Sequence, residues 1–184
     1  MRASDIPEDF DRVLYTDEQV ASRVREVAAQ IDADYAGREI LMVGVLNGAV
    51  MTMADLCRAM KSHMSMDWMA VSSYGAGTKS SGVVRILKDL TKDIEGRDIL
   101  IVEDIIDTGL TLSYLVQNLR SRNPNSIEIM AMFRKPEAVT CSLDVKYVGF
   151  DIPNEFVVGY GLDYADKYRN LTDVATLAPH VYNS

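Results

Sequence analysis

Apolar residues along the chain fall into two patterns, short continuous runs and runs with helical spacing. The first helical run follows Thr16, and a Gln three residues later completes the form of a capping box. Apolar side chains then recur at positions 20, 24, 27 and 31, up to about Tyr35. Gly37 follows the run. This spacing predicts an amphipathic helix with a structural role.

The continuous apolar runs are short and bounded by turn residues, as is typical of strands buried on both faces. The predicted strands cover residues 40–46, 66–73, 83–87, 99–102, 127–133 and 145–150. A helical pattern follows the first of these strands and continues through residue 60. Another follows the fourth strand, over about 112–122. Strands that alternate with helices predict an α/β fold with a mostly parallel, doubly wound sheet.

The chain is long enough for one domain with a proper core, so residues 1–184 are predicted to form a single domain. After Pro136 the sequence is rich in strand and loop patterns. The segment of about 137–184 is therefore predicted to form a small cap over the carboxyl ends of the strands. N-terminal residues can also contribute to this cap.

The central stretch, residues 100–112, passes from a buried strand through a polar loop into a helix. Glu103 and Asp104 follow the strand, Asp107 comes three residues after Asp104, and the loop continues as Thr108-Gly109-Leu110-Thr111. Small residues and a helix N-terminus offer N–H donors to a phosphate, whereas the carboxylates would repel it. The carboxylates suit a sugar diol, a magnesium ion or a proton in transit. Together these preferences describe a 5-phosphoribosyl group.

Two other interpretations of this stretch remain open from its residues alone. A buried strand that enters a helix with acidic capping is common in α/β proteins. Asp107-Thr108-Gly109 is also the tripeptide of aspartic proteases, whose chemistry requires two such aspartates that share a proton. The chain has a single copy of the tripeptide, so this reaction would require a homodimer.

Two further loops follow predicted strands. Leu46-Asn47-Gly48 leads from the first strand into a helix, which makes either a phosphate-sized crevice or an ordinary turn. Residues 74–82 are rich in Gly and Ser and contain no apolar anchor. Such a segment is either a solvated hairpin tip or a lid that excludes water from a reaction.

Composition and charge narrow the classes of partner. The net charge of −8 argues against nucleic acid or an anionic membrane held by bulk electrostatics. No apolar run approaches the roughly 18 residues of a membrane span, and two histidines offer no zinc constellation. The polar, acidic N-terminus and the isolated Cys57 and Cys141 predict a cytoplasmic protein with reduced thiols.

The segment from Tyr147 to Arg169 combines aromatic residues, glycines and aspartates, which suits the binding of a flat ring. Its motif Ile-Pro-x-x-Phe-Val-Val-Gly-Tyr-x-Leu-Asp-Tyr, followed by Tyr-Arg, is similar to that of hypoxanthine phosphoribosyltransferases. The stretch Val102 to Thr111 resembles the phosphoribosyl-diphosphate signature of type I phosphoribosyltransferases. The resemblance extends over roughly residues 40–172. It implies the type I phosphoribosyltransferase fold and Mg²⁺-dependent transfer of a 5-phosphoribosyl group from phosphoribosyl diphosphate to N9 of a 6-oxopurine.

The resemblance also implies roles for the central stretch. Glu103 and Asp104 would hold the ribose hydroxyls and help to position Mg²⁺, and Asp107 would be the general base or proton shuttle at purine N7. Thr108 to Thr111 would bind the 5′-phosphate. The family sometimes has Lys at the position of Leu110, so this pocket would rely more on backbone donors.

Further roles follow for the purine. Phe156 would stack on the ring, the backbone of Val157 would contact its edge, and Lys135 would donate to the 6-oxygen. Asp163 would lie near both Mg²⁺ and the 2-position of the base. An ammonium group only donates hydrogen bonds, so Lys135 would disfavour a 6-amino purine such as adenine. Arg169 would meet the pyrophosphate.

The remaining implied contacts lie in the two other loops. Leu46, Asn47 and Gly48 would lie beside the pyrophosphate, often with a non-proline cis peptide in this family. A Lys is commoner where this chain has Asn47, which weakens the expectation of a charged contact there. Ser73 and Tyr74 match a Ser-Tyr pair at the family's flexible catalytic loop.

The reaction expected from the resemblance is purine salvage with hypoxanthine, and by extension guanine, as the base. Two alternatives are a xanthine- or guanine-preferring relative and a regulator that senses phosphoribosyl diphosphate and binds RNA. The resemblance also implies a homodimer or homotetramer.

Overall fold

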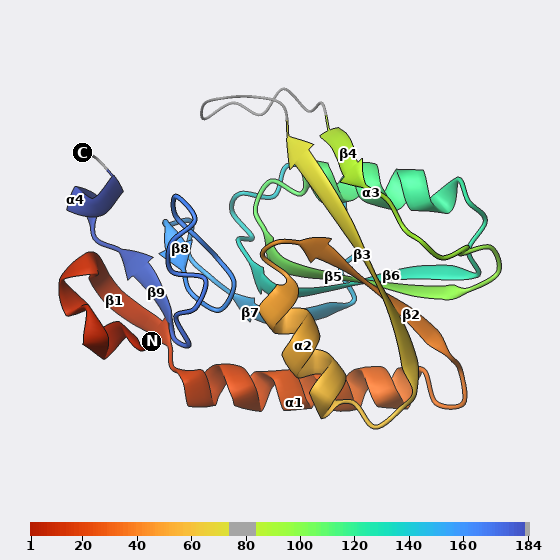
Figure 1. Ribbon diagram of the computed structural model, residues 1–184, viewed down its shortest axis with the longest axis horizontal. Coiled ribbons are helices and arrows are strands. Elements are labelled where there is room, and N and C mark those ends of the chain that lie inside the picture. Colours follow the sequence, from red (N-terminus) through yellow and green to blue (C-terminus); the bar gives the residue numbers. More distant parts are fainter. Residues whose placement is uncertain (74–83, 183–184) are drawn as a thin grey trace.

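The computed structural model describes residues 1–73 and 84–182. A six-stranded sheet forms its centre, in the order β4-β3-β2-β5-β6-β7 (Figure 1). Its strands are β2 (Ile40–Leu46), β3 (Met64–Ser73), β4 (Val84–Lys88), β5 (Asp98–Ile106), β6 (Ser126–Arg134) and β7 (Tyr147–Asp151). Neighbouring strands are parallel except β3 and β4, which are antiparallel. The predicted α/β fold with a mostly parallel sheet is confirmed.

Helices cover both faces of this sheet. Met42 and Leu100 pack toward α1 (Asp17–Asp34) and α2 (Val50–Ala59), whereas their neighbours Leu41 and Ile99 pack toward α3 (Leu110–Arg120) on the opposite face. Figure 1 shows α1 and α2 on one side of the sheet and α3 on the other. The central strands are therefore buried on both faces, which explains their continuous apolar runs.

The first long helix begins where the capping box predicted. The Thr16 hydroxyl accepts a hydrogen bond from Gln19 N at 3.4 Å, and the Gln19 side chain accepts one from Thr16 N at 2.9 Å. The apolar residues at positions 20, 24, 27 and 31 are all buried. Tyr35 forms the C-cap, and Gly37 adopts a positive φ of 76° just beyond it.

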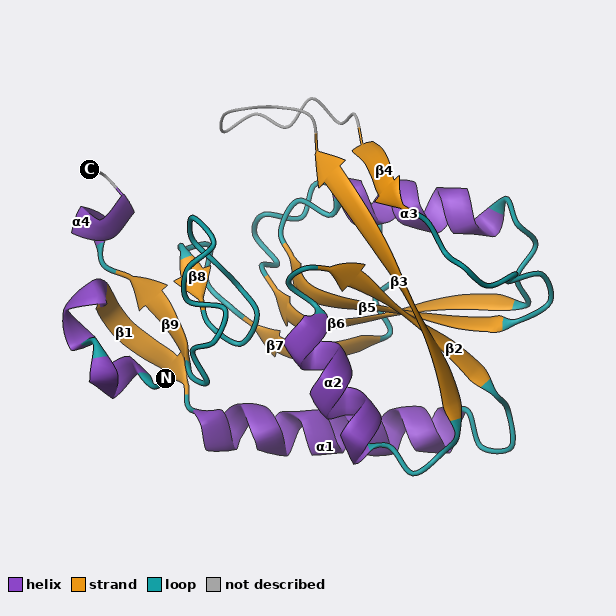
Figure 2. Cartoon of the chain, viewed as in Figure 1, coloured by secondary structure: helices purple, strands orange, loops and turns teal. Residues whose placement is uncertain are grey.

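A second, three-stranded antiparallel sheet brings the two ends of the chain together. Its order is β1 (Phe10–Tyr15), β9 (Val174–Leu177) and β8 (Val157–Val158). The short 3-10 helices η1 (Ala3–Asp5) and η2 (Pro7–Asp9) precede it, and α4 (Pro179–Tyr182) follows it. The loops between β8 and β9, teal in Figure 2, lie between the small sheet and the large one.

The cap differs from the predicted range of about 137–184 in one respect. β7 lies within that range but pairs with β6, so it completes the large sheet and begins at Tyr147, two residues after the predicted start. The small sheet also contains β1 from the N-terminal segment, which pairs with β9. In the described part of the chain, none of the helices has the length and apolar character needed to span a bilayer.

Candidate active site

The acidic loop lies at the carboxyl end of β5, the position where ligands bind in open parallel sheets. Glu103 and Asp104 lie near the carboxyl end of β5. Asp107 to Gly109 form the loop, and α3 begins at Leu110. Gly109 has a φ of 80°, which favours glycine. A Cβ at Gly109 would also meet Cys141 Sγ and Leu143 Cδ1 at 2.8 Å. The loop can therefore keep this shape only with glycine at this position.

Of the two acids near the end of β5, Glu103 is buried and Asp104 is half-buried. Glu103 is 7% exposed, and burial together with the neighbouring Asp104 raises its pKa well above the usual range. Burial also raises the pKa of Asp104 to about 6, although the Ile105 N–H donates to its carboxylate at 2.8 Å. Raised carboxyl pKa values in a cleft mark a site where charge is stabilised only when a ligand arrives.

The loop after β2 lies directly against Asp104. The Leu46–Asn47 peptide bond is cis. A Cβ on Gly48 would lie 1.6 Å from Asp104 Oδ2, so the carboxylate occupies the space that a side chain would fill. A Cβ on Gly161 would in turn lie 2.2 Å from the Gly48 carbonyl oxygen. The loops after β2, β5 and β8 therefore meet at this end of the sheet.

The residues after β8 add a paired cation and anion. Arg169 forms an ion pair with Asp163 at 2.7 Å and donates to the Gly161 carbonyl at 2.8 Å. Asp163 raises the pKa of Asp104 and Arg169 lowers it, so both act electrostatically on the acidic loop. Asp163 and Arg169 thus lie at one site, in contact with each other.

One cavity of about 250 Å³ unites the predicted purine contacts with the acidic loop. Its lining residues are Asp104, Ile105, Asp107, Lys135, Phe156, Val157, Leu162 and Asp163. Lys135 Nζ lies 3.8 Å from the Asp107 carboxylate, and the Lys135 side chain is 13% exposed. The cavity combines an aromatic face, backbone groups and both signs of charge, as a site for a polar flat ring requires.

A neighbouring cavity of about 130 Å³ is formed by the loop itself, between Glu103 and Leu112, and includes Thr108, Gly109 and Thr111. The first hydrogen bond of α3 runs from Ser113 N to Gly109 O at 2.9 Å. The N–H groups that precede it face the end of the helix, where they favour an anion. This geometry suits a phosphate group.

Comparison with known proteins decides the family. The profile of the phosphoribosyl transferase domain matches residues 13–165. The chain belongs to this family. A hypoxanthine-guanine phosphoribosyltransferase of Mycobacterium tuberculosis is 54% identical over 182 residues, which cover 96% of this chain and 90% of that protein. One from Streptococcus agalactiae is 49% identical over 175 residues, covering 95% and 97%.

The structure of this chain also superposes on solved phosphoribosyltransferase structures. A crystal structure of a hypoxanthine phosphoribosyltransferase from Staphylococcus aureus superposes with a TM-score of 0.94, at 46% identity, over 98% of both chains. The predicted family and fold are therefore confirmed.

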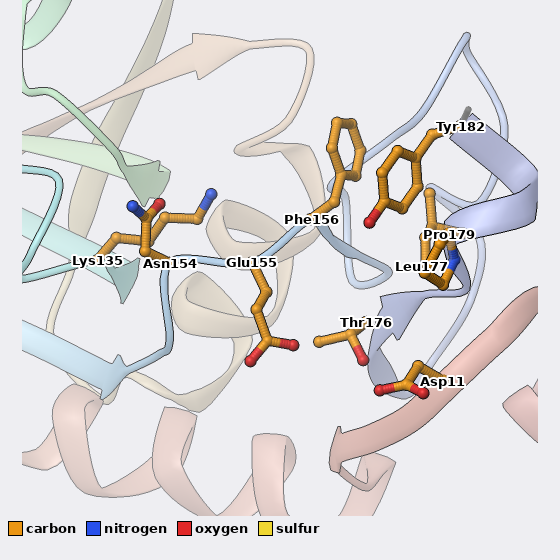
Figure 3. A pocket seen from close by; sticks show the side chains of 9 residues that line it. All are labelled: Asp11, Lys135, Asn154, Glu155, Phe156, Thr176, Leu177, Pro179 and Tyr182. Carbon is orange, nitrogen blue, oxygen red and sulfur yellow. The ribbon is translucent and has the colours of Figure 1, made fainter.

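The structure adds aromatic neighbours of Phe156 that the sequence analysis did not identify. The Phe156 ring stacks on Tyr182 of α4, with ring centroids 5.5 Å apart and an angle of 19°. It meets the edge of Tyr164 at 5.3 Å. Figure 3 shows the rings of Phe156 and Tyr182 side by side, at a third cavity of about 500 Å³. No local signal indicated Tyr182, because α4 reaches Phe156 only through the small sheet.

Two further predicted sets are the lid pair Ser73 and Tyr74 and the metal ligands. Ser73 is the last residue of β3, whereas Tyr74 lies outside the described residues. Across the residues that the structure describes, no three His, Cys, Asp or Glu side chains converge as ligands of one metal ion. The predicted metal set of Glu103, Asp104 and Asp163 therefore stays a prediction, to be judged by the chemistry of its carboxylates.

Proposed function

We propose that this phosphoribosyltransferase salvages purines by transferring the 5-phosphoribosyl group of phosphoribosyl diphosphate to N9 of hypoxanthine and guanine. The products are IMP or GMP and pyrophosphate. About half of the residues are identical to those of hypoxanthine-guanine phosphoribosyltransferases over nearly the whole chain. The observation that carries the proposal is the single cavity that joins Asp107, Lys135, Phe156 and Asp163.

The purine fits this cavity in one orientation. The exposed Phe156 ring offers a stacking face, and the buried Val157 places backbone groups at the ring edge. Lys135 donates to the 6-oxygen, and Asp163 lies toward the 2-position. Asp107, 3.8 Å from Lys135, then lies on the same side as N7, where it accepts or returns a proton.

The phosphoribosyl group extends from the purine toward the acidic loop. The Glu103 and Asp104 carboxylates accept hydrogen bonds from the ribose hydroxyls, which offsets the cost of their burial. Thr108, Gly109, Leu110 and Thr111 donate to the 5′-phosphate. The pyrophosphate lies beside Leu46, Asn47 and Gly48, near Arg169. Ser73 and Tyr74 begin a loop that excludes water from the reacting carbon.

The carboxylates also fit a magnesium ion. Mg²⁺ prefers oxygen ligands and is usually bound through one or two carboxylates together with substrate phosphates. Asp104 and Asp163 supply such carboxylates at the edge of the cavity, with Glu103 behind them. When bound, Mg²⁺ would neutralise charge on the departing pyrophosphate. We further expect the protein to be cytoplasmic. We also expect a homodimer or homotetramer, and light scattering after size exclusion would test this oligomeric state.

A spectrophotometric assay with Mg²⁺ and phosphoribosyl diphosphate tests the proposal, with hypoxanthine, guanine, xanthine and adenine offered separately. Turnover of hypoxanthine and guanine is expected, with none of adenine. The Lys135→Met variant should lose most activity toward 6-oxopurines, whereas Lys146→Met, which removes a lysine paired with Asp34 and Glu128, should keep it. Turnover of xanthine alone would favour the alternative specificity. Absence of turnover with all four bases would refute the proposal.

A further inference from the structure

The carbonyl oxygen of Thr108, in the loop that precedes α3, is the acceptor for three donors of one segment. Thr140 donates to it through its backbone N at 3.1 Å and through its hydroxyl at 3.3 Å. The Cys141 thiol donates to the same oxygen at 3.4 Å. Thr140 and Cys141 belong to the connection between β6 and β7, more than thirty residues further along the chain. A carbonyl held by three donors has one favoured direction.

The same segment also packs against the next residue of the loop. At Gly109, an added Cβ would meet Cys141 Sγ and Leu143 Cδ1 at 2.8 Å, so Cys141 touches the backbone itself. Leu143 is partly buried and packs against the buried apolar group around α3 and β6. Hydrogen bonds on Thr108 and close packing on Gly109 therefore act on adjacent peptide units. Thr140, Cys141 and Leu143 are not among the residues that line the cavity of Thr108, Gly109 and Thr111.

We propose that Thr140 and Cys141 are positioning residues for the 5′-phosphate of the substrate. By fixing the Thr108 carbonyl, they orient the Thr108–Gly109 peptide and the first N–H groups of α3 toward the anion. The phosphate site then requires less reorganisation on binding, which increases affinity. This inference rests on the proposed function, because it assigns the loop to a phosphoribosyl substrate. It concerns residues that do not themselves touch that substrate.

Steady-state kinetics provide the first test. The double variant Thr140→Ala/Cys141→Ala keeps the backbone donor but removes both side-chain donors. KM for phosphoribosyl diphosphate should rise about tenfold, as expected from the loss of one or two hydrogen bonds. The KM for hypoxanthine and kcat should change less than about twofold, since neither Thr108 nor Gly109 lines the proposed purine cavity. Cys141→Ser, which retains a donor, should remain close to wild type.

Cys57→Ala is the matched control, because the thiol of Cys57 contacts Met42 and Met66 instead of the loop. It should leave KM for phosphoribosyl diphosphate unchanged. An equal rise in both KM values, or no rise in the double variant, would overturn the inference. A general loss of folded protein would lower the apparent kcat and leave both KM values unchanged. A rise in KM for phosphoribosyl diphosphate alone therefore distinguishes a positioning role from a loss of folding.

Two measurements keep the test independent of turnover and of folding. Calorimetric titration with ribose 5-phosphate should show about tenfold weaker binding in the double variant, whether or not a base is turned over. If that variant does not fold, iodoacetamide labelling of the wild type decides. Bound phosphoribosyl diphosphate should slow the labelling of Cys141 and leave that of Cys57 unchanged. Equal labelling rates of Cys141 with and without phosphoribosyl diphosphate would refute the inference.

Discussion

Replacement of Gly48 by alanine is the sharpest test of how the site is assembled. The added Cβ would lie 1.6 Å from Asp104 Oδ2 and 2.5 Å from its Cγ. The Cβ and Oδ2 atoms must separate by about 1.4 Å before they reach 3.0 Å, the shortest distance that real Cβ contacts show. Asp104 cannot simply rotate into solvent without loss, because its carboxylate accepts a hydrogen bond from Ile105 N.

The expected magnitude follows from this displacement. A shift of about 1 Å in a catalytic group commonly costs about 100-fold in rate, or roughly 3 kcal/mol of transition-state stabilisation. Gly48→Ala should therefore lower kcat/KM for phosphoribosyl diphosphate about 100-fold. Overpacking of this kind also costs about 1–3 kcal/mol of stability. For a chain of this length, the melting temperature should fall by several degrees.

Gly149→Ala is the matched control. Its Cβ would lie 2.3 Å from the Met132 carbonyl oxygen, so it overpacks the contact between β6 and β7, away from the acidic loop. It should lower the melting temperature comparably while kcat/KM per folded molecule stays near that of the wild type. If Gly48→Ala retained kcat/KM within about threefold of wild type, Asp104 would not act from the position that the structure gives it.

Three further predictions concern separate residues. Asp107→Asn should lower kcat by about 10²- to 10⁴-fold and leave KM for phosphoribosyl diphosphate nearly unchanged; unchanged kcat in steady-state assays would remove Asp107 from proton transfer. Tyr182→Leu should raise KM for hypoxanthine about two- to tenfold through lost support of Phe156, and an unchanged KM would contradict this. Asp67 is buried, yet hydrogen bonds from Trp68 and from the segment at Thr91 lower its pKa to about 2. Its contribution of about 2–3 kcal/mol is present above pH 4 and is lost as the pH falls toward 2. Urea titrations should thus show wild type and Asp67→Asn differing at pH 7 and converging at pH 2, and a constant difference would refute the assignment.

Local signals predicted the central elements well. The capping box at Thr16 and the continuous apolar run of β5 depend only on neighbouring residues and on burial between two helical layers. The position of Glu103 and Asp104 followed from a general rule, since parallel strands present their carboxyl ends at one edge of the sheet. The site could therefore be located at one end of β5 before the path of the rest of the chain was known.

Long-range pairing was the part that the sequence did not reveal. β1 pairs with β9 about 160 residues later, as in the Phe10–Leu177 pair, and its residues show no strict alternation of buried and exposed positions. Leu177 N in turn donates to the Phe156 carbonyl at 2.9 Å. The small sheet thereby fixes the backbone beside the purine cavity, and it carries Tyr182 to the Phe156 ring. Only tertiary packing decides such contacts.

The cations of the proposed site are paired with aspartates, which limits how strongly side-chain charge can attract the proposed phosphoribosyl substrate. Lys135 faces Asp107, and Arg169 is paired with Asp163 at 2.7 Å. These two cations are therefore partly neutralised by aspartates before any substrate arrives, while burial raises the pKa of Asp104. Attraction of phosphoribosyl diphosphate by side-chain charge alone would be weak under these conditions. The N–H groups at the start of α3 do not titrate and carry no aspartate partner of this kind, so they are best suited to hold the 5′-phosphate. In the proposed function, the carboxylates are then left to the ribose hydroxyls and to a cation that accompanies the pyrophosphate.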